Sequence, residues 1–169
     1  MLISPPFNLQ KWIEEHRHLL KPPVGNSLVF PNGDFMIMAV GGPNARKDYH
    51  IDDGAEFFYQ VQGDVTVRLL ENGQPRDITI KEGDVFLLPP RVPHSPQRPA
   101  NTVGLVIERK REDHEKDGFL WICDSCNEKL YEEFVHVTDI VNQLPKVFDH
   151  FYGNTDLTTC KKCGTVAKR

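Results

Sequence analysis

The sequence has no hydrophobic run that approaches the roughly 20 apolar residues needed to cross a bilayer. Residues 1–7 also lack the basic start and the apolar core of a secretory signal, which predicts a cytoplasmic protein. Basic residues are in the minority, since 20 Lys and Arg stand against 24 Asp and Glu, for a formal net charge of −4. The charge pattern of a nucleic-acid-binding protein is therefore missing. We expect neither nucleic acid nor a membrane as a partner.

Cysteine is scarce, and its four copies form two Cys-x-x-Cys pairs, Cys123 with Cys126 and Cys160 with Cys163. In a reducing compartment such pairs are more often metal ligands or redox groups than disulfides. A thioredoxin-like redox role is disfavoured, because neither pair opens a helix after a strand–helix–strand unit. Two pairs separated by 33 residues are typical of a tetrahedral four-thiolate site without an open position. We expect a structural site for Fe or Zn, and the sequence does not distinguish these metals.

Turn-forming residues, by contrast, are frequent, with 13 prolines and 12 glycines in 169 residues. The pattern predicts an amphipathic helix over 8–20 and then short strands separated by Gly, Asn and Asp turns. Regular short strands of this kind indicate a β-sandwich or β-barrel. The predicted strands are 28–30, 35–40, 47–51, 56–62, 65–70, 77–80, 85–88 and 102–109.

Residues 110–118 carry a run of mixed charge, which is typical of a solvated linker. Beyond it the pattern predicts two strands and a helix, at 119–123, 131–137 and 138–151. We therefore divide the chain into two parts. Residues 1–112 form a β-barrel with an N-terminal helix, and residues 113–169 form a small rubredoxin-like extension around the four cysteines.

Three potential metal ligands, His50, Glu56 and His94, stand inside two glycine-punctuated strand motifs. Two imidazoles and one carboxylate are the set that holds non-haem Fe(II) and leaves positions open for O₂ and a chelating substrate. The spacing resembles that of the cupin superfamily, with Asp52 in the place of a second histidine. An Fe(II) oxygenase is the leading hypothesis, and a Mn(II) or Ni(II) enzyme is the alternative.

Side chains near these ligands add to the hypothesis. Because side chains alternate along a strand, Arg46 shares a face with His50, and Arg98 shares one with His94. Glu108 lies in an otherwise apolar strand, where a carboxylate is costly to bury unless it is paired or used. The alternatives are that both arginines are surface cations and that Glu108 is the structural partner of an arginine.

Five segments of the chain carry a more specific pattern, namely 21–26, 40–44, 56–60, 83–90 and 94–99. Together they resemble the 3-hydroxyanthranilate 3,4-dioxygenase family, and the resemblance runs from residue 5 to the C-terminus. It implies a single cupin (jelly-roll) β-barrel, an Fe(II)-dependent enzyme and a homodimer. The implied reaction converts 3-hydroxyanthranilate and O₂ to 2-amino-3-carboxymuconate semialdehyde, the precursor of quinolinate. This step belongs to the kynurenine pathway of tryptophan catabolism and to NAD biosynthesis.

Residue by residue, the resemblance implies that His50, Glu56 and His94 are the iron ligands. The further implied site residues are Arg98 and Glu108 at the substrate, with Glu56 beside them, Arg46 at the O₂ pocket, and Asn26 and Pro96 in the pocket wall. The competing functions are a non-catalytic cupin module that senses an aromatic acid and a different cupin enzyme. A thiol dioxygenase, for example, usually uses three histidines, where this chain offers a glutamate.

Overall fold

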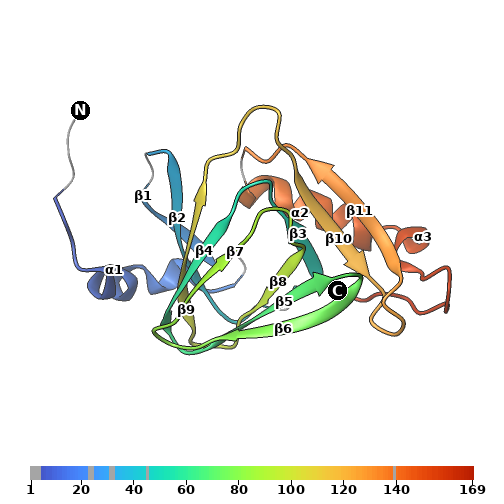
Figure 1. Ribbon diagram of the computed structural model, residues 1–169, viewed down its shortest axis with the longest axis horizontal. Coiled ribbons are helices and arrows are strands. Elements are labelled where there is room, and N and C mark those ends of the chain that lie inside the picture. The colour runs from blue at the N-terminus through green and yellow to red at the C-terminus, as the bar shows by residue number, and fades with distance from the viewer. Residues whose placement is uncertain (1–4, 23–24, 31–32, 45, 139) are drawn as a thin grey trace.

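The computed structural model describes residues 5–22, 25–30, 33–44, 46–138 and 140–169 (Figure 1). Three helices, one 3₁₀ turn and eleven strands are found in these ranges. The helical elements are α1 (Leu9–His16), η1 (Arg17–Leu19), α2 (Ile140–Tyr152) and α3 (Thr155–Thr158). The strands are β1 (Asn26–Phe30), β2 (Phe35–Gly41), β3 (Asp48–Ile51), β4 (Glu56–Gln62), β5 (Val65–Glu71), β6 (Gln74–Ile80), β7 (Val85–Leu88), β8 (His94–Gln97), β9 (Val103–Arg109), β10 (Asp117–Ile122) and β11 (Lys129–Val135).

Two antiparallel sheets form the body of the molecule. Five strands pair in the order β1-β2-β9-β4-β7, and six pair in the order β11-β10-β3-β8-β5-β6. Neighbouring strands in each sheet are often far apart in the sequence, as with β4 beside β9 and β10 beside β3. The predicted mainly β fold with an N-terminal helix is confirmed, and each predicted strand lies within three residues of an observed one.

The main hydrophobic core lies between the two sheets. Alternate residues of each strand point inward, so both sheets contribute apolar side chains to the same layer. This burial removes apolar surface from water, and it holds the two sheets face to face. The buried members are Met38, Phe58, Leu88 and Val106 from the five-stranded sheet, and Val65, Val67, Leu69 and Ile80 from the six-stranded sheet.

Helix α1 covers the five-stranded sheet at the N-terminal side of the molecule (Figure 1). The side chain of Asn8 caps the helix by accepting a hydrogen bond from the backbone N–H of Lys11 at 2.9 Å. Ile13, on the apolar face, is fully buried against residues of β1, β2 and β9. The helix predicted over 8–20 is confirmed, with its last turn tightened into η1.

Strand β8 was not among the predicted strands, because the surrounding prolines indicate an irregular segment. In the structure β8 pairs with β5 over four residues, but it pairs with β3 at one position, His50 opposite His94. This sparse pairing suits a strand that contains Pro96, which has no N–H to donate. The short helix α3 was also not predicted.

The C-terminal segment continues the barrel rather than standing apart from it. Strand β10 pairs with β3 and β11 pairs with β10, so both extend the six-stranded sheet. Helix α2 packs on these strands, with Trp121 stacked on Phe151 at 4.4 Å between ring centroids. Residue 139, within the helix predicted at 138–151, lies outside the described residues. The division at residue 112 stays a prediction.

The prediction that 110–118 is a solvated linker is wrong at several positions. The Arg111 side chain is 6 % exposed and that of Asp117 is 1 % exposed. Glu115 is also buried, and Asp117 already belongs to β10. These charges tolerate burial because they pair with opposite charges. A mixed-charge run predicts solvation only when its charges have no partners from the rest of the fold.

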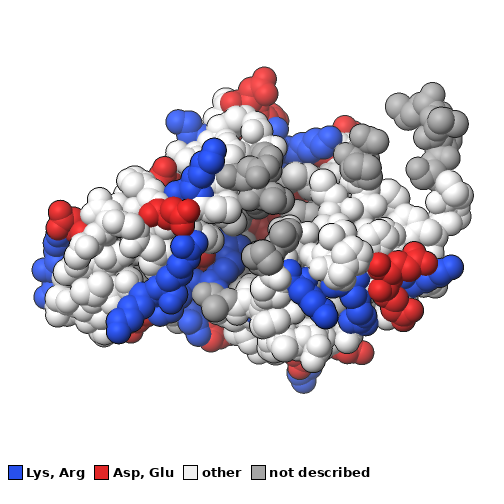
Figure 2. All heavy atoms as spheres, turned by 180° about the vertical axis from the view of Figure 1, so that it is seen from behind, with Lys and Arg blue, Asp and Glu red and all other residues white. Residues whose placement is uncertain are grey.

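The outer surface is mixed in charge. On the face shown in Figure 2, basic and acidic side chains are interspersed with uncharged residues. Among the described residues, no helix combines the length and the apolar character required to span a bilayer.

Candidate metal centre and active site

Strand pairing brings the three predicted ligands together. The antiparallel register places His50 of β3 directly opposite His94 of β8. Glu56 begins β4 in the facing sheet, where it stands opposite Glu108 of β9. One ligand atom from each of His50, Glu56 and His94 lies within 4.8 Å of the other two, and all three side chains are buried. Residues separated by 44 positions in the chain therefore form one cluster because two sheets meet there.

The outer nitrogens of both imidazoles are held by hydrogen-bond acceptors. His94 Nδ1 lies 3.0 Å from the carbonyl oxygen of Val92, and His50 Nε2 lies 2.7 Å from Asp117 Oδ2. Because a carbonyl and a carboxylate only accept, each outer nitrogen carries the proton and donates it. The inner nitrogens, His94 Nε2 and His50 Nδ1, both face Glu56, where each would offer a lone pair to a bound cation. Such outer partners orient histidine ligands in metalloproteins.

Glu56 is the acidic member of the cluster. Its Oε1 lies 3.0 Å from His94 Nε2 and 3.6 Å from His50 Nδ1, but no described group donates it a hydrogen bond. Burial raises the pKa of Glu56, yet the two histidines outweigh burial and hold its pKa well below the usual range. A buried carboxylate oxygen without a donor is costly. A metal cation between the three side chains would satisfy it, so the residues present fit a metal ion.

The electrostatics of His50 agree with a cation site. Burial lowers the pKa of His50, but its contacts with Asp117 and Glu56 outweigh burial and raise the pKa to about 10. The surrounding carboxylates therefore favour positive charge at this point of the barrel. The same field would attract a divalent ion.

A cavity of about 90 Å³ opens beside the three ligands. Its walls combine polar groups that can orient a ligand with an apolar side that can contact a flat ring. The cavity contains every residue that the sequence placed at the active site. The polar walls are Asn26, Asn44, Arg46, Arg98 and Glu108 beside the ligands, and the remaining walls are Met38, Val40, Phe58, Pro96 and Val106.

Arg98 is a buried cation without an acidic partner among the described residues. It is 3 % exposed, and its guanidinium donates a long hydrogen bond to the amide oxygen of Gln60 at 3.4 Å. Burial and the charge of Arg46 lower the pKa of Arg98 to about 10. The alternative that Arg98 is a surface cation is wrong. A buried guanidinium that lacks a carboxylate is suited to binding an anionic ligand.

Arg46 differs from Arg98 because it has a partner. It donates two hydrogen bonds to Asp48, one of them from Nε at 3.1 Å, and its side chain is 27 % exposed. It still lines the cavity. Asp48 is itself buried, as are all four residues of β3.

Glu108 lies in the cavity wall and is also paired with Arg111. Burial and the charge of Glu56 raise the pKa of Glu108 to about 7, although Arg111 acts in the opposite direction. Both sequence-based readings of Glu108 therefore describe part of its environment. It is the partner of an arginine, and it also faces the place where a ligand would lie.

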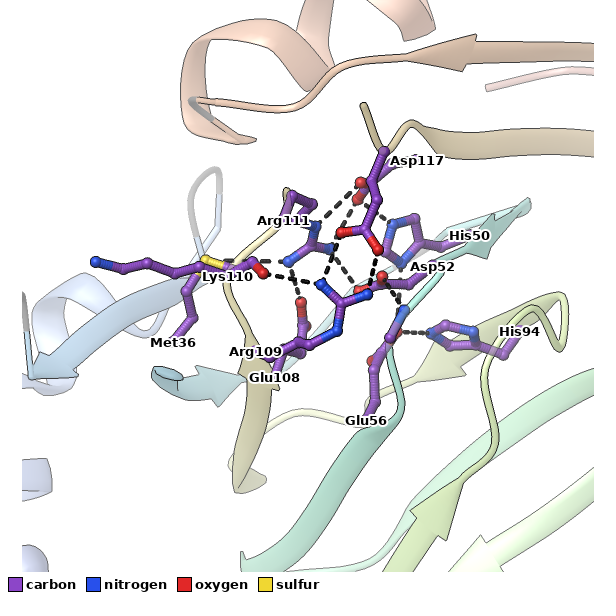
Figure 3. A network of polar contacts seen from close by, with 12 residues as sticks. Met36, His50, Asp52, Glu56, His94, Glu108, Arg109, Lys110, Arg111 and Asp117 are labelled. Atoms are coloured by element: carbon purple, nitrogen blue, oxygen red, sulfur yellow. Dashed lines mark hydrogen bonds and ion pairs between the residues drawn. The ribbon is translucent and has the colours of Figure 1, made fainter. Parts of the chain in front are cut away.

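Two residues of this region were missed by the sequence analysis, namely Arg111 and Asp117. Figure 3 shows them beside His50, Asp52 and Glu108. Asp52, which stands in the place of a second histidine, accepts the backbone N–H of Gly54 with its Oδ1 at 2.7 Å. The sequence signal for Arg111 is weak. It lies three residues after Glu108, but the chain offers several other basic residues that could pair with this glutamate.

The four cysteines form a second cluster at the far end of the chain. All are free thiols, and their sulfurs lie 3.5–3.6 Å apart in three of the pairs. A disulfide would need about 2.0 Å, whereas a tetrahedral ion bound at about 2.3 Å to each sulfur sets the sulfurs about 3.8 Å apart. The arrangement fits one metal ion with four thiolate ligands.

The two Cys-x-x-Cys turns have the same backbone pattern. In each turn the carbonyl of the first cysteine accepts the N–H four residues later, from Asn127 at 2.9 Å and from Gly164 at 2.9 Å. Asn127 and Gly164 both have a positive φ, of 57° and 77°. Glycine and asparagine are the residues that adopt this conformation most easily. Local sequence is therefore enough to build each half of this cluster.

Comparison with known proteins gives a consistent family signal. A family model described as 3-hydroxyanthranilic acid dioxygenase matches residues 1–152. A 3-hydroxyanthranilate 3,4-dioxygenase of Xanthomonas campestris pv. campestris (strain B100) is 54 % identical over 165 residues, which cover 98 % of this chain and 93 % of that protein. One from Burkholderia cenocepacia is 51 % identical and covers 95 % of this chain and 92 % of that protein.

A more distant relative of the same name comes from Bacillus thuringiensis (strain Al Hakam), at 47 % identity over 95 % of this chain and 90 % of that protein. Among solved structures, protein NMB1881 from Neisseria meningitidis has a TM-score of 0.48 at 19 % identity. That similarity covers 58 % of this chain and 96 % of the other, and no functional conclusion follows from it.

Proposed function

The chain belongs to the 3-hydroxyanthranilic acid dioxygenase family, and we propose that His50, Glu56 and His94 hold the Fe(II) on which its reaction depends. That reaction cleaves the ring of 3-hydroxyanthranilate with O₂ and forms 2-amino-3-carboxymuconate semialdehyde, the precursor of quinolinate. The observation that carries the proposed metal site is the convergence of three buried ligand atoms on one point, with one carboxylate oxygen left without a donor. When bound, Fe(II) would supply open coordination positions for O₂ and for a chelating substrate, together with the redox chemistry of ring opening.

Arg98 is proposed to bind the carboxylate of the substrate. The guanidinium is buried in the cavity wall and has no acidic partner among the described residues, so an anionic ligand would complete its pairing. Its planar fork matches a carboxylate in a bidentate manner, which fixes the orientation of the ring as well as its position. The apolar walls, including Phe58 and Val106, would contact the faces of the ring.

Glu108 is proposed to accept the proton of the substrate hydroxyl. A pKa raised to about 7 allows this carboxyl to take up a proton near neutral pH. Arg46 also faces the cavity and keeps its positive charge, since Asp48 outweighs burial and raises the pKa of Arg46. Arg46 is proposed to stabilise negative charge that develops on O₂. Asn26 and Pro96 are proposed as walls that limit the shape of the substrate.

A direct test combines metal analysis with oxygen uptake. Protein loaded with Fe(II) is mixed with 3-hydroxyanthranilate with and without air, and O₂ consumption is compared with substrate loss. Equimolar consumption supports the proposal. Tight binding without O₂ consumption would instead support a non-catalytic binding module, and activity with Mn(II) or Ni(II) but not with Fe(II) would overturn the metal assignment.

The four-cysteine cluster is proposed to hold a structural Fe or Zn ion. Four protein ligands leave no position for a substrate, and the cluster lies outside the cavity. We also propose a cytoplasmic location, since Cys-x-x-Cys pairs that bind a metal rather than form disulfides are typical of a reducing compartment.

A homodimer is proposed, with its interface on the part of the five-stranded sheet's outer face that β4 and β7 form, beside the part that α1 covers. Phe57 of β4 stands directly opposite Ile107 of β9 on one side and Leu87 of β7 on the other. Leu87 is 61 % exposed and the neighbouring Val85 is 62 % exposed. A continuous exposed apolar row of this kind is typical of an interface. A second copy of the chain is the proposed occupant, because it would bring an identical apolar row.

The test of this interface is the mass of the protein in solution. Leu87→Glu should convert a dimer to a monomer in light scattering, whereas Arg76→Glu on β6 of the other sheet should leave the dimer intact. A wild-type protein that is monomeric at micromolar concentration would overturn the proposal.

A further inference from the structure

Arg111 is enclosed by carboxylates directly after strand β9. Its guanidinium pairs with Glu108 through Nη1, lies 2.7 Å from Asp117 Oδ2 and lies 2.8 Å from Asp52 Oδ2 (Figure 3). Its side chain is 6 % exposed, so water screens these contacts little. One buried cation therefore joins three acidic side chains that come from three different segments of the chain.

Asp117 connects this cation to the proposed metal centre. Its Oδ2 accepts the Nε2–H of His50 at 2.7 Å and also an Arg111 N–H at 2.7 Å. Its Oδ1 accepts the Nε–H of Arg111 at 3.0 Å. The carboxylate is thus bound in a bidentate manner on one side and hydrogen-bonded to a ligand on the other. The contacts run without interruption from His50 through Asp117 and Arg111 to Glu108.

We propose that Arg111, acting through Asp117, is a positioning residue that holds the ligand His50 and the cavity carboxylate Glu108 in one fixed arrangement. The inference rests on the proposed function, since it takes His50 as a metal ligand. A planar guanidinium with donors at fixed angles sets both the distance and the orientation of the carboxylates it binds. One residue thereby orients both a proposed metal ligand, His50, and a carboxylate of the substrate cavity, Glu108.

The charge of Arg111 is needed as well as its shape. Without it, Asp52, Glu108 and Asp117 would bring three carboxylates together in a buried region beside Glu56. Like charges in such an environment repel one another and draw protons or move apart. Lysine would keep the charge, but its single ammonium group cannot bind Asp117 and Glu108 with the same fixed geometry. Arg111→Lys therefore separates geometry from charge.

The neighbouring Arg109 provides a matched control. It lies two positions away and is also ion-paired, but its partner is Glu115 and its side chain is 38 % exposed. Within the described residues, its side chain has no hydrogen bond or ion pair with that of His50 or Glu108. A substitution of Arg109 by lysine therefore makes the same chemical change in the same segment, outside the proposed arrangement.

The experiment compares Arg111→Lys, Asp117→Asn and Arg109→Lys in the full-length protein. The affinity of the catalytic site for Fe(II) is measured anaerobically by chelator competition, and KM and kcat for 3-hydroxyanthranilate are measured on iron-loaded protein. Loss of an outer partner of a metal ligand commonly lowers affinity or activity by about 10–100-fold. We expect a loss of this size in metal affinity for both Asp117→Asn and Arg111→Lys. Arg109→Lys should stay within about twofold of the wild type.

Metal bound by the four cysteines is the internal reference in each sample. Its stoichiometry should not change, which separates a specific effect from general unfolding. If Arg111→Lys does not fold, the inference is tested by comparing the Fe(II) affinity of Asp117→Asn with that of Arg109→Lys. Equal metal affinities in those two variants would overturn the inference.

A double-mutant comparison tests whether Arg111 connects the two sides. In the otherwise wild-type protein, the effect of the double variant Asp117→Asn/Glu108→Gln on kcat/KM should differ by at least about threefold from the product of the two single-variant effects. In protein that also carries Arg111→Lys, the effect of the double variant should equal the product of the two single-variant effects. Multiplicative effects in both backgrounds would show that Asp117 and Glu108 act separately and would overturn the positioning role.

Failure of this inference is distinguishable from failure of the proposed function. If the wild type does not bind Fe(II) at His50, Glu56 and His94, the proposed metal site falls and the positioning role falls with it. If the wild type binds Fe(II) and turns over, but the Arg111 and Asp117 variants behave like Arg109→Lys, the positioning role alone is wrong.

Discussion

The two metal-binding clusters of this protein are built in opposite ways. The His50, Glu56 and His94 cluster takes its ligands from β3, β4 and β8, which belong to two different sheets. The cysteine cluster takes its ligands from two turns of identical backbone pattern. The first exists only when the barrel has closed, whereas each half of the second is formed by five consecutive residues, Cys123–Asn127 and Cys160–Gly164.

The surroundings of the two clusters also differ. Each histidine is oriented by a partner outside the cluster, and a cavity lies beside it with a buried arginine in its wall. The cysteine cluster has four ligands and backbone turns around it, and Cys163 is exposed at the surface. A site with three ligands and a cavity can bind a substrate, whereas a site with four ligands can hold the chain together. Strand β10 joins them, since Asp117 begins it and Cys123 follows its end.

The largest expected effect follows from removing a ligand of the first cluster. Glu56→Ala or His94→Ala should abolish turnover, because two remaining ligands cannot retain Fe(II) under assay conditions. The fold should persist, since the main core lies between other residues of the sheets. Iron content and O₂ uptake are measured together with circular dichroism. A variant that keeps a full complement of iron at this site would refute the ligand assignment.

The second-largest effect is expected when the cysteine cluster is broken. Cys126→Ser should lower the melting temperature by roughly 5–10 °C, because the metal contributes to folding and about 1 kcal/mol corresponds to 2–4 °C in a chain of this size. Activity per bound iron should change much less, since the cysteines lie outside the cavity. Thermal unfolding and kcat per iron are the two measurements. A stable variant with no activity at full iron content would contradict the proposed division of roles.

A smaller effect is expected from the substrate side of the first cluster. Arg98→Lys should raise KM for 3-hydroxyanthranilate about tenfold, or about 1.4 kcal/mol, because lysine keeps the charge but loses the bidentate contact. Iron affinity should remain unchanged, since Arg98 is not a ligand. Steady-state kinetics and chelator competition test both statements. Arg68→Lys, on the far side of β5 and paired with Asp77, is the control.

The smallest effect concerns pH. The raised pKa of Glu108, about 7, means that the carboxylate form becomes dominant as pH rises through that value. If Glu108 accepts the substrate proton, kcat/KM should fall on the acid side, with a midpoint at or below about 7 because bound Fe(II) adds positive charge nearby. Glu108→Gln should lower kcat/KM and remove this acid limb. An unchanged pH profile in Glu108→Gln would assign the limb to another group.

Much of the candidate site could be predicted because its signals are local. The alternation of side chains placed Arg46 on the face of His50, and ligand chemistry selected Glu56 and His94. The cysteine turns could be predicted equally well, because the backbone of each turn depends on only a few neighbouring residues. Asp117 could not be predicted, because it is 67 residues from His50 and lies in a charged run that resembles a solvated linker.

By itself, the sequence determined which residue types could bind metal, where the short strands other than β8 lie and how each cysteine turn is shaped, since all of these depend on neighbours within a few positions. The tertiary structure alone decided that β10 pairs with β3 and brings Asp117 to His50, and that Arg111 is buried among three carboxylates. The physical reason is that the partner of a buried charge is chosen by the packing of distant strands. The free energy of such a pairing is not encoded in either segment separately.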